Sequence, residues 1–147
     1  MRLRLLIVMC AVSAMIGCGC LGGGGLPDNP PDYVDSLYTS AAGPDGMTAY
    51  FILADENGQM TTANGYMVLE VKDEDGRAYS RRSGNVTADQ FTKAKIGMGA
   101  FEREAILFNI GRWTFPGGSP SGRVTSTLTF TTEDGRELTA TDTTYYD

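Results

Sequence analysis

The stretch Val124-Thr125-Ser126-Thr127-Leu128-Thr129-Phe130-Thr131 decides the fold class of this chain. Its apolar residues alternate with threonines, which is the two-residue period of a β-strand that has one buried face. The segment Glu133-Asp134-Gly135-Arg136 follows, and an Asp-Gly pair supplies the positive φ angles that a tight hairpin turn needs. Residues 138–145 then return as the partner strand. The sequence therefore predicts an antiparallel hairpin here.

Similar runs rich in Val, Ile, Tyr, Phe and Thr occur upstream, separated by clusters of Gly, Asp and Asn roughly every 10 to 15 residues. Within one of them, Tyr50 and Ile52 face one way while Phe51 and Leu53 face the other. The runs predict further strands over residues 33–39, 48–54, 66–72, 77–82 and 104–110.

Two segments carry a helical signal. Residues 87–90 resemble a capping box, with a Thr hydroxyl followed three residues later by Gln90, and predict one or two helical turns before Gly97. Residues 100–108 also place apolar side chains on one helical face. We prefer a strand there, because β-branched and aromatic residues dominate its end.

From residue 32 to residue 147 the chain has roughly 115 residues, the size of one domain, and no second linker divides it. The pattern predicts an all-β fold. It resembles a single immunoglobulin-like or fibronectin type III antiparallel β-sandwich of about seven strands with one short helical turn. The resemblance is architectural, because the Cys–Trp–Cys framework of antibody domains is missing and Trp113 is the sole tryptophan.

The N-terminal residues have the pattern of an export signal. Arg2 and Arg4 form a short positive segment, and residues 5–16 carry no charge and are nearly all apolar. Twelve residues are too few for a membrane-spanning helix, which needs about 20, but they suit the core of a signal peptide.

Met15-Ile16-Gly17-Cys18 resembles a prokaryotic lipobox of the kind found in bacterial and archaeal lipoproteins. The resemblance implies that Cys18 becomes the first mature residue and carries a lipid such as palmitate or an archaeal isoprenoid. Cys20, which follows Gly19, is the second candidate. Plain secretion with cleavage elsewhere and an uncleaved N-terminal anchor are the alternatives. The expected organisation is therefore a signal peptide over 1–17, a lipidated Cys and Gly/Pro-rich linker over 18–31, and a β-sandwich over 32–147.

The charge of the chain limits its partners. It has 12 Lys and Arg against 18 Asp and Glu, so the formal net charge is −6. Loss of residues 1–17 removes two arginines and leaves 10 basic against 18 acidic residues, a net charge of −8. Such a domain is not expected to bind nucleic acid or to be attracted by anionic lipid headgroups. The linker, with four consecutive glycines, is expected to be flexible.

Catalytic and metal-binding chemistry is poorly represented. The chain has no His, and its three Cys all lie in the first 20 residues, which excludes Cys–His catalysis, His-based zinc sites and a disulfide framework from the remainder. The acidic turns at 55–57 and 73–76 suggest hairpin turns, with calcium loops that approach one another as the alternative. We expect no enzyme activity, no metal and no cofactor.

Three surface features are candidates for recognition. Asn85-Val86-Thr87 is an N-glycosylation pattern, for which a helix cap at Thr87 is the alternative explanation. Trp113 and Phe115 precede a Gly-rich segment and form either a partner contact or part of the core. The outward threonines of the last hairpin form either an ordinary solvent-facing surface or a flat hydroxyl lattice such as ice-binding proteins use.

These features lead to one functional expectation. The chain is expected to be a lipoprotein at the extracytoplasmic face of a cell membrane, anchored by its lipid. Its β-sandwich would serve binding, adhesion or scaffolding with an envelope protein or a glycan. The alternative is a secreted carbohydrate-active or other hydrolytic accessory domain.

Overall fold

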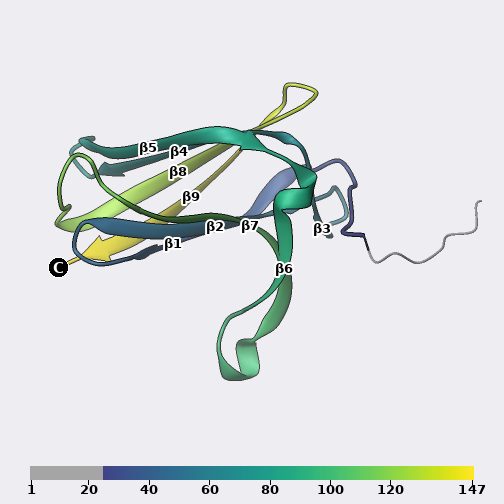
Figure 1. Ribbon diagram of the computed structural model, residues 1–147, viewed down its shortest axis with the longest axis horizontal. Coiled ribbons are helices and arrows are strands. Elements are labelled where there is room, and N and C mark those ends of the chain that lie inside the picture. The colour runs from purple at the N-terminus through teal and green to yellow at the C-terminus, as the bar shows by residue number, and fades with distance from the viewer. Residues whose placement is uncertain (1–24) are drawn as a thin grey trace, which may run out of the picture.

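The computed structural model describes residues 25–147, which form a sandwich of two antiparallel β-sheets (Figure 1). Two single 3-10 turns, Ala88–Gln90 and Gly99–Phe101, are the helical elements of this part of the chain. The strands are β1 (Tyr33–Ala41), β2 (Gly46–Ala54), β3 (Met60–Thr61), β4 (Gly65–Asp73), β5 (Ala78–Val86), β6 (Phe91–Ile96), β7 (Arg103–Thr114), β8 (Gly122–Thr132) and β9 (Glu137–Tyr146).

One sheet, called sheet A here, has the strand order β1-β2-β7-β6, with the short β3 beside β2. The other, sheet B, has the order β5-β4-β8-β9. Immunoglobulin domains have the corresponding orders A-B-E-D and G-F-C, and β5 adds one strand next to the strand equivalent to C. The predicted all-β sandwich is confirmed, and the described residues form nine strands where about seven were expected.

The core lies between the two sheets and is filled by alternate residues of each strand. On β8, Val124, Leu128 and Phe130 are fully buried, while the threonines between them face outward as the sequence pattern predicted. Phe51 of β2 lies at the centre, and its ring centroid is 5.2 Å from that of Phe108 and 5.8 Å from that of Phe130. The first contact joins neighbouring strands of sheet A and the second joins the two sheets. Both stabilise the sandwich through apolar burial and aromatic packing.

The helical expectation for residues 87–96 is wrong beyond its first turn. Gln90 does reach back, and its Oε1 accepts the backbone N–H of Thr87 at 2.9 Å. However, the next residue, Phe91, is buried and starts strand β6, which pairs with β7 from Phe91 opposite Phe108 to Ile96 opposite Arg103. Burial of Phe91 in the core and pairing with β7 outweigh the local helix signal. The strand expected at 104–110 is confirmed and extends over Arg103–Thr114.

The folded part includes residues 26–31, which lie before the boundary expected at residue 32. Leu26 packs against the core, and the carbonyl oxygen of Pro27 accepts the backbone N–H of Thr62 at 2.9 Å. The carbonyl oxygen of Asn29 accepts the hydroxyl of Thr61 at 2.6 Å. Residues 26–31, which we expected to be linker, are therefore attached to the sandwich.

The expected signal peptide (1–17) and the lipid attachment residues Cys18 and Cys20 lie outside the described residues. Within residues 25–147, no helix has the length and apolar character needed to cross a membrane.

Candidate functional site

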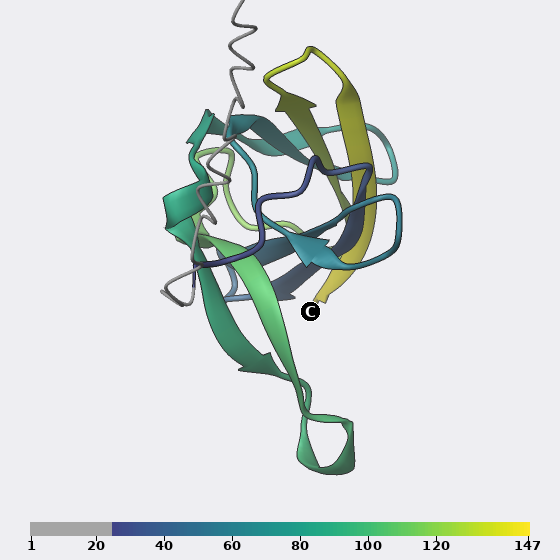
Figure 2. The ribbon, with the colours of Figure 1, turned by 90° about the vertical axis from the view of Figure 1, so that its right-hand side faces the viewer.

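A hairpin arm projects from sheet A and is the most distinctive surface feature (Figures 1 and 2). Strand β7 pairs with β2 only as far as Phe108, opposite Phe51. Beyond that point β3 takes the place beside β2, at Leu53 and Ala54, and the N-terminal half of β7 leaves the sandwich together with β6. We define the arm as residues 91–108.

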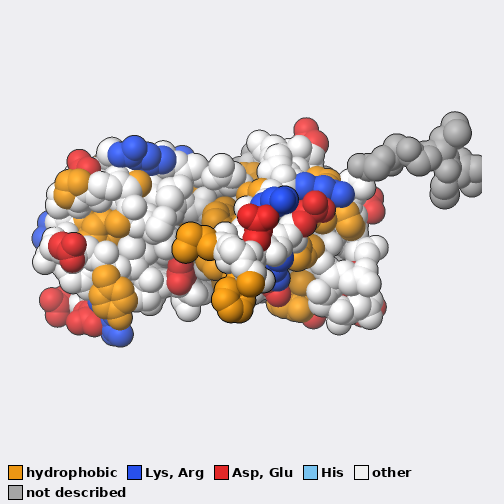
Figure 3. All heavy atoms as spheres, turned by 90° about the horizontal axis from the view of Figure 1, so that it is seen from below, with side chains coloured by type: hydrophobic (Ala, Val, Ile, Leu, Met, Phe, Trp, Pro, Cys, Tyr) orange, Lys and Arg blue, Asp and Glu red, His pale blue; other side chains and the backbone are white. Residues whose placement is uncertain are grey.

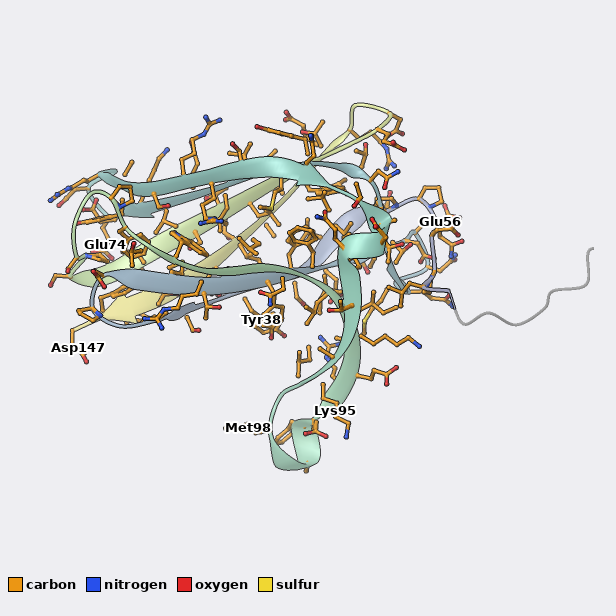
Figure 4. All side chains as sticks on the ribbon, in the orientation of Figure 1. Tyr38, Glu56, Glu74, Lys95, Met98 and Asp147 are labelled. Carbon is orange, nitrogen blue, oxygen red and sulfur yellow. The ribbon has the colours of Figure 1, made fainter. Side chains whose placement is uncertain are left out.

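The tip of the arm, residues 97–101, is apolar and exposed. Met98 is 85% exposed and Phe101 is 88% exposed, and Figure 4 shows Met98 at the end of the arm, away from the sandwich. Gly97 has a φ of +90°, and a Cβ there would lie 2.4 Å from the carbonyl oxygen of Phe101. The tight turn therefore requires glycine at this position, and it presents the two large apolar side chains to solvent.

The root of the arm is packed against the outer face of sheet A. Ile52, Ala105 and Leu107 are buried together with Ile96 in an apolar cluster separate from the main core. The backbone N–H of Ile106 also points to the sulfur of Met60, 3.3 Å away. These contacts hold the arm in one direction, whereas its tip makes no such cluster.

Two tyrosines fill the corner between the arm and the sandwich. The rings of Tyr38 on β1 and Tyr50 on β2 stack, with centroids 4.8 Å apart and an interplanar angle of 28°. Tyr38 is 41% exposed, and burial raises the pKa of Tyr50 above its ordinary value of 10.0. A small hollow of about 120 Å³ lies between these tyrosines and Phe101 and Arg103 of the arm. The arm and this corner together form a partly apolar surface.

Paired charges line the flanks of the arm below its tip. Lys95 Nζ lies 3.1 Å from Glu102, and Lys93 Nζ lies 3.9 Å from Glu104. All four side chains are exposed, so each pair contributes little to stability. Figure 3, viewed from the side on which the arm projects, shows acidic and basic side chains beside hydrophobic ones. Lysines on the edge strand β6 also discourage pairing with a further strand.

The signal for this arm was present in the sequence. Lys93 and Lys95 on one side and Glu102 and Glu104 on the other mirror each other across a glycine-containing turn. Opposite charges on facing strands favour a hairpin, and Lys95 does lie opposite Glu104 in the register. The capping box at residues 87–90 predicted a helix here instead, and the arm was not predicted.

A second hollow, of about 460 Å³, lies at the end of the sandwich where the chain enters. Its wall includes Arg136, whose guanidinium donates to the carbonyl oxygen of Pro31 at 3.0 Å and to Asp134 at 2.9 Å. Hydrogen bonds from Thr132 and Arg136 hold the pKa of Asp134 below its ordinary value.

The two acidic turns lie at opposite ends of the sandwich, as the positions of Glu56 and Glu74 in Figure 4 show. The alternative, that they approach one another as calcium loops, is therefore wrong, and the expected hairpin turns are confirmed. In each turn one carboxylate caps backbone N–H groups, as Asp55 does for residues 57 and 59 at 2.9 Å and Asp73 does for residues 75 and 77. These contacts are those of hairpin turns. Within residues 25–147, no three acidic side chains are grouped as a metal site would require.

Trp113 and Phe115, the candidate partner contacts, lie in the core, with 7% and 5% of their surface exposed. The indole Nε1 of Trp113 donates to the hydroxyl of Ser80 at 3.0 Å. The ring of Phe115 lies between those of Tyr79 and Tyr146. These residues form the core packing that was the alternative, and the structure does not present them as an exposed aromatic loop.

Asn85, the candidate glycosylation residue, is exposed on β5, an edge strand of sheet B. The threonines of the last hairpin do face outward in register, with Thr125 opposite Thr143, Thr127 opposite Thr141 and Thr129 opposite Thr139. They form a hydroxyl-rich outer face of sheet B, on the side of the sandwich opposite the arm (Figure 1).

No protein-family model matches this chain, and no curated protein or solved structure matches it either.

Proposed function

We propose that this protein is an exported lipoprotein, anchored through lipid on Cys18 at the extracytoplasmic face of a prokaryotic membrane, whose β-sandwich is a binding module. The binding serves adhesion or scaffolding with an envelope protein or glycan. The N-terminal pattern of residues 1–18 supports the anchor, and the arm supports the binding role.

The observation that carries the binding role is the exposure of Met98 and Phe101 at the end of a rigidly rooted arm. The cores of the sandwich and of the arm root are complete without these side chains. Large apolar groups presented together on a projection are typical of interaction surfaces. Burial against a partner would contribute about 1.5–3 kcal/mol for each side chain.

The anchor is tested by intact mass spectrometry of the protein extracted from its native membranes. We expect a chain that begins at Cys18 and carries a covalent lipid. Cys18→Ser should release the protein from the membrane fraction, while Cys20→Ser, the matched control, should leave it there. If only Cys20→Ser releases the protein, the lipid is attached to Cys20 and not to Cys18. A soluble protein that still begins at Met1 would overturn the proposal.

A further inference from the structure

We propose that the tip of the arm inserts into the interface of the same bilayer that holds Cys18, so that the protein rests on its membrane at two points. This inference rests on the lipid anchor proposed above. It names a lipid surface as the partner of the arm tip, so that an envelope protein or glycan would contact the rest of the sandwich.

The chemistry of the tip fits the boundary between headgroups and acyl chains. Residues 96–101 carry no charge, and the two largest exposed side chains, Met98 and Phe101, point into solvent. The 3-10 turn satisfies part of its own backbone, because Phe101 N–H donates to Met98 O at 3.1 Å and Glu102 N–H donates to Gly99 O at 3.2 Å. Backbone groups that are already paired cost less to remove from water, which a bilayer requires.

The charges of the arm stop just short of the tip. Lys95 pairs with Glu102, and the next residue, Arg103, lies opposite Ile96 in the hairpin. Lysine and arginine stems lie along apolar surface while their charged ends stay with the headgroups. The charged side chains of Lys95, Glu102 and Arg103 would therefore stay at the headgroups and limit insertion to the tip. Because the mature chain has a net charge of −8, attraction to anionic lipid does not contribute, and apolar burial has to provide the binding.

The lengths of the arm and of the tether agree. A six-residue strand such as β6 extends about 20 Å. Only seven residues separate Cys18 from Leu26, which packs against the core, and seven residues span at most roughly 25 Å. The lipid on Cys18 and the tip of the arm can therefore reach the same membrane surface. A single acyl chain holds a protein only marginally, so a second contact of this kind would make the attachment durable.

Insertion of the tip would also orient the sandwich. The arm rises from the outer face of sheet A, and the threonine-rich face of sheet B lies on the opposite side (Figure 1). With the tip in the membrane, that face would point away from the bilayer, toward partners outside the cell.

The test uses the lipidated full-length mature protein, extracted from membranes and reconstituted into phosphatidylcholine vesicles with and without brominated acyl chains. Phe101→Trp places a reporter at the tip, and Tyr145→Trp places a control at another exposed aromatic position, which is 70% exposed on β9. The buried Trp113 gives a constant background that is subtracted using the parent protein. We expect brominated lipid to quench at least half of the added emission of Phe101→Trp and to leave that of Tyr145→Trp unchanged.

A second experiment measures the contribution of the tip to membrane binding without a tryptophan reporter. The double change Met98→Ser and Phe101→Ser should weaken retention on washed membranes about tenfold or more, whereas Tyr145→Ser should not. Circular dichroism of the purified variants checks that both still fold.

The outcomes separate the two proposals. If the protein carries lipid on Cys18 but Phe101→Trp is not quenched, the anchor stands and tip insertion is overturned. Cross-linking between unquenched tips would then identify a second copy as the partner. If Cys18 carries no lipid and the protein does not associate with membranes, both proposals fail together.

Discussion

The carboxylate of Asp142 on β9 accepts two hydrogen bonds from Thr39 on β1, from its backbone N–H at 2.6 Å and from its hydroxyl at 2.8 Å. The hydroxyl of Thr39 also lies 2.8 Å from that of Thr144. Strands β1 and β9 are edge strands of different sheets. One charged side chain thus joins the two sheets along one side of the sandwich and pairs an edge N–H that would otherwise be open.

We expect Asp142→Ala to lower the free energy of unfolding by about 1–3 kcal/mol, because it leaves the N–H of Thr39 without its partner. Urea denaturation followed by circular dichroism measures this loss. Thr141→Ala is the matched control, since Thr141 is exposed on the same strand, and its effect should stay within about 0.5 kcal/mol. Equal effects of the two changes would show that this contact does not join the sheets.

Tyr146 makes stability sensitive to alkaline pH. Its hydroxyl donates to the carbonyl oxygen of Gly46 at 2.8 Å, and burial raises its pKa from 10.0 to about 12. The raised pKa favours the neutral form in the folded state, so its contribution is complete below pH 10 and is lost as the pH rises toward 12.

Tyr146→Phe should therefore lower stability at neutral pH by about 1 kcal/mol and reduce the further loss between pH 10 and 12. Thermal unfolding over this pH range measures both effects. Tyr145→Phe, at the exposed neighbouring position, should leave the alkaline loss as it is in the parent protein. An unchanged slope in the Tyr146→Phe variant would contradict the assignment.

Asp55 has the opposite dependence on pH. The backbone N–H of Gln59, followed by the N–H of Asn57 and the side chain of Asn29, holds the pKa of this carboxyl below 3.8 despite its burial. The contribution of the charged form is complete above the unfolded value and is lost as the pH falls through the folded pKa.

We expect Asp55→Asn to destabilise the protein at neutral pH and to flatten the loss of stability below about pH 4. Melting temperatures measured from about pH 6 down to about pH 2 test this. Glu56→Gln, next to it and exposed, is the control and should keep the acid loss of the parent. A parent-like acid profile in Asp55→Asn would place the acid sensitivity elsewhere.

Two glycines in paired strands of sheet B should differ sharply when changed to alanine. A Cβ on Gly65 would lie 2.4 Å from the carbonyl oxygen of Thr131 and 2.6 Å from the ring of Phe130, whereas a Cβ on Gly84 would meet nothing within 4 Å. Gly65→Ala should cost about 1–3 kcal/mol through overpacking. Gly84→Ala should be neutral or stabilise by up to about 1 kcal/mol, because alanine restricts the unfolded chain. Chemical denaturation compares them, and similar values would contradict the packing argument.

The strands of the last hairpin were predictable because their signal is local. Alternation along β8 and the Asp-Gly turn before β9 depend on neighbouring residues only, and both strands lie where the sequence placed them. The placement of Trp113 was not predictable in the same way. Its burial depends on Ser80 and on Arg82, whose guanidinium lies over the indole ring, and these residues are far from it in the chain.

The projection of the arm could not be predicted from local sequence patterns. Its mirrored charges could have predicted a hairpin, but its projection depends on β7 leaving β2 at Phe108. That departure is set by β3, a two-residue strand with too few residues for a periodic signal. The candidate site therefore emerged from the packing of segments that the sequence pattern treats separately.

By itself, the sequence determined the all-β class, most strand positions and the turn residues, because alternation and positive φ angles are properties of adjacent residues. The tertiary structure alone decided which edges meet, that Trp113 and Phe115 are buried, and that Met98 and Phe101 are presented on an arm. These outcomes depend on contacts between residues as distant as Thr39 and Asp142, which form only when the whole chain packs into one core.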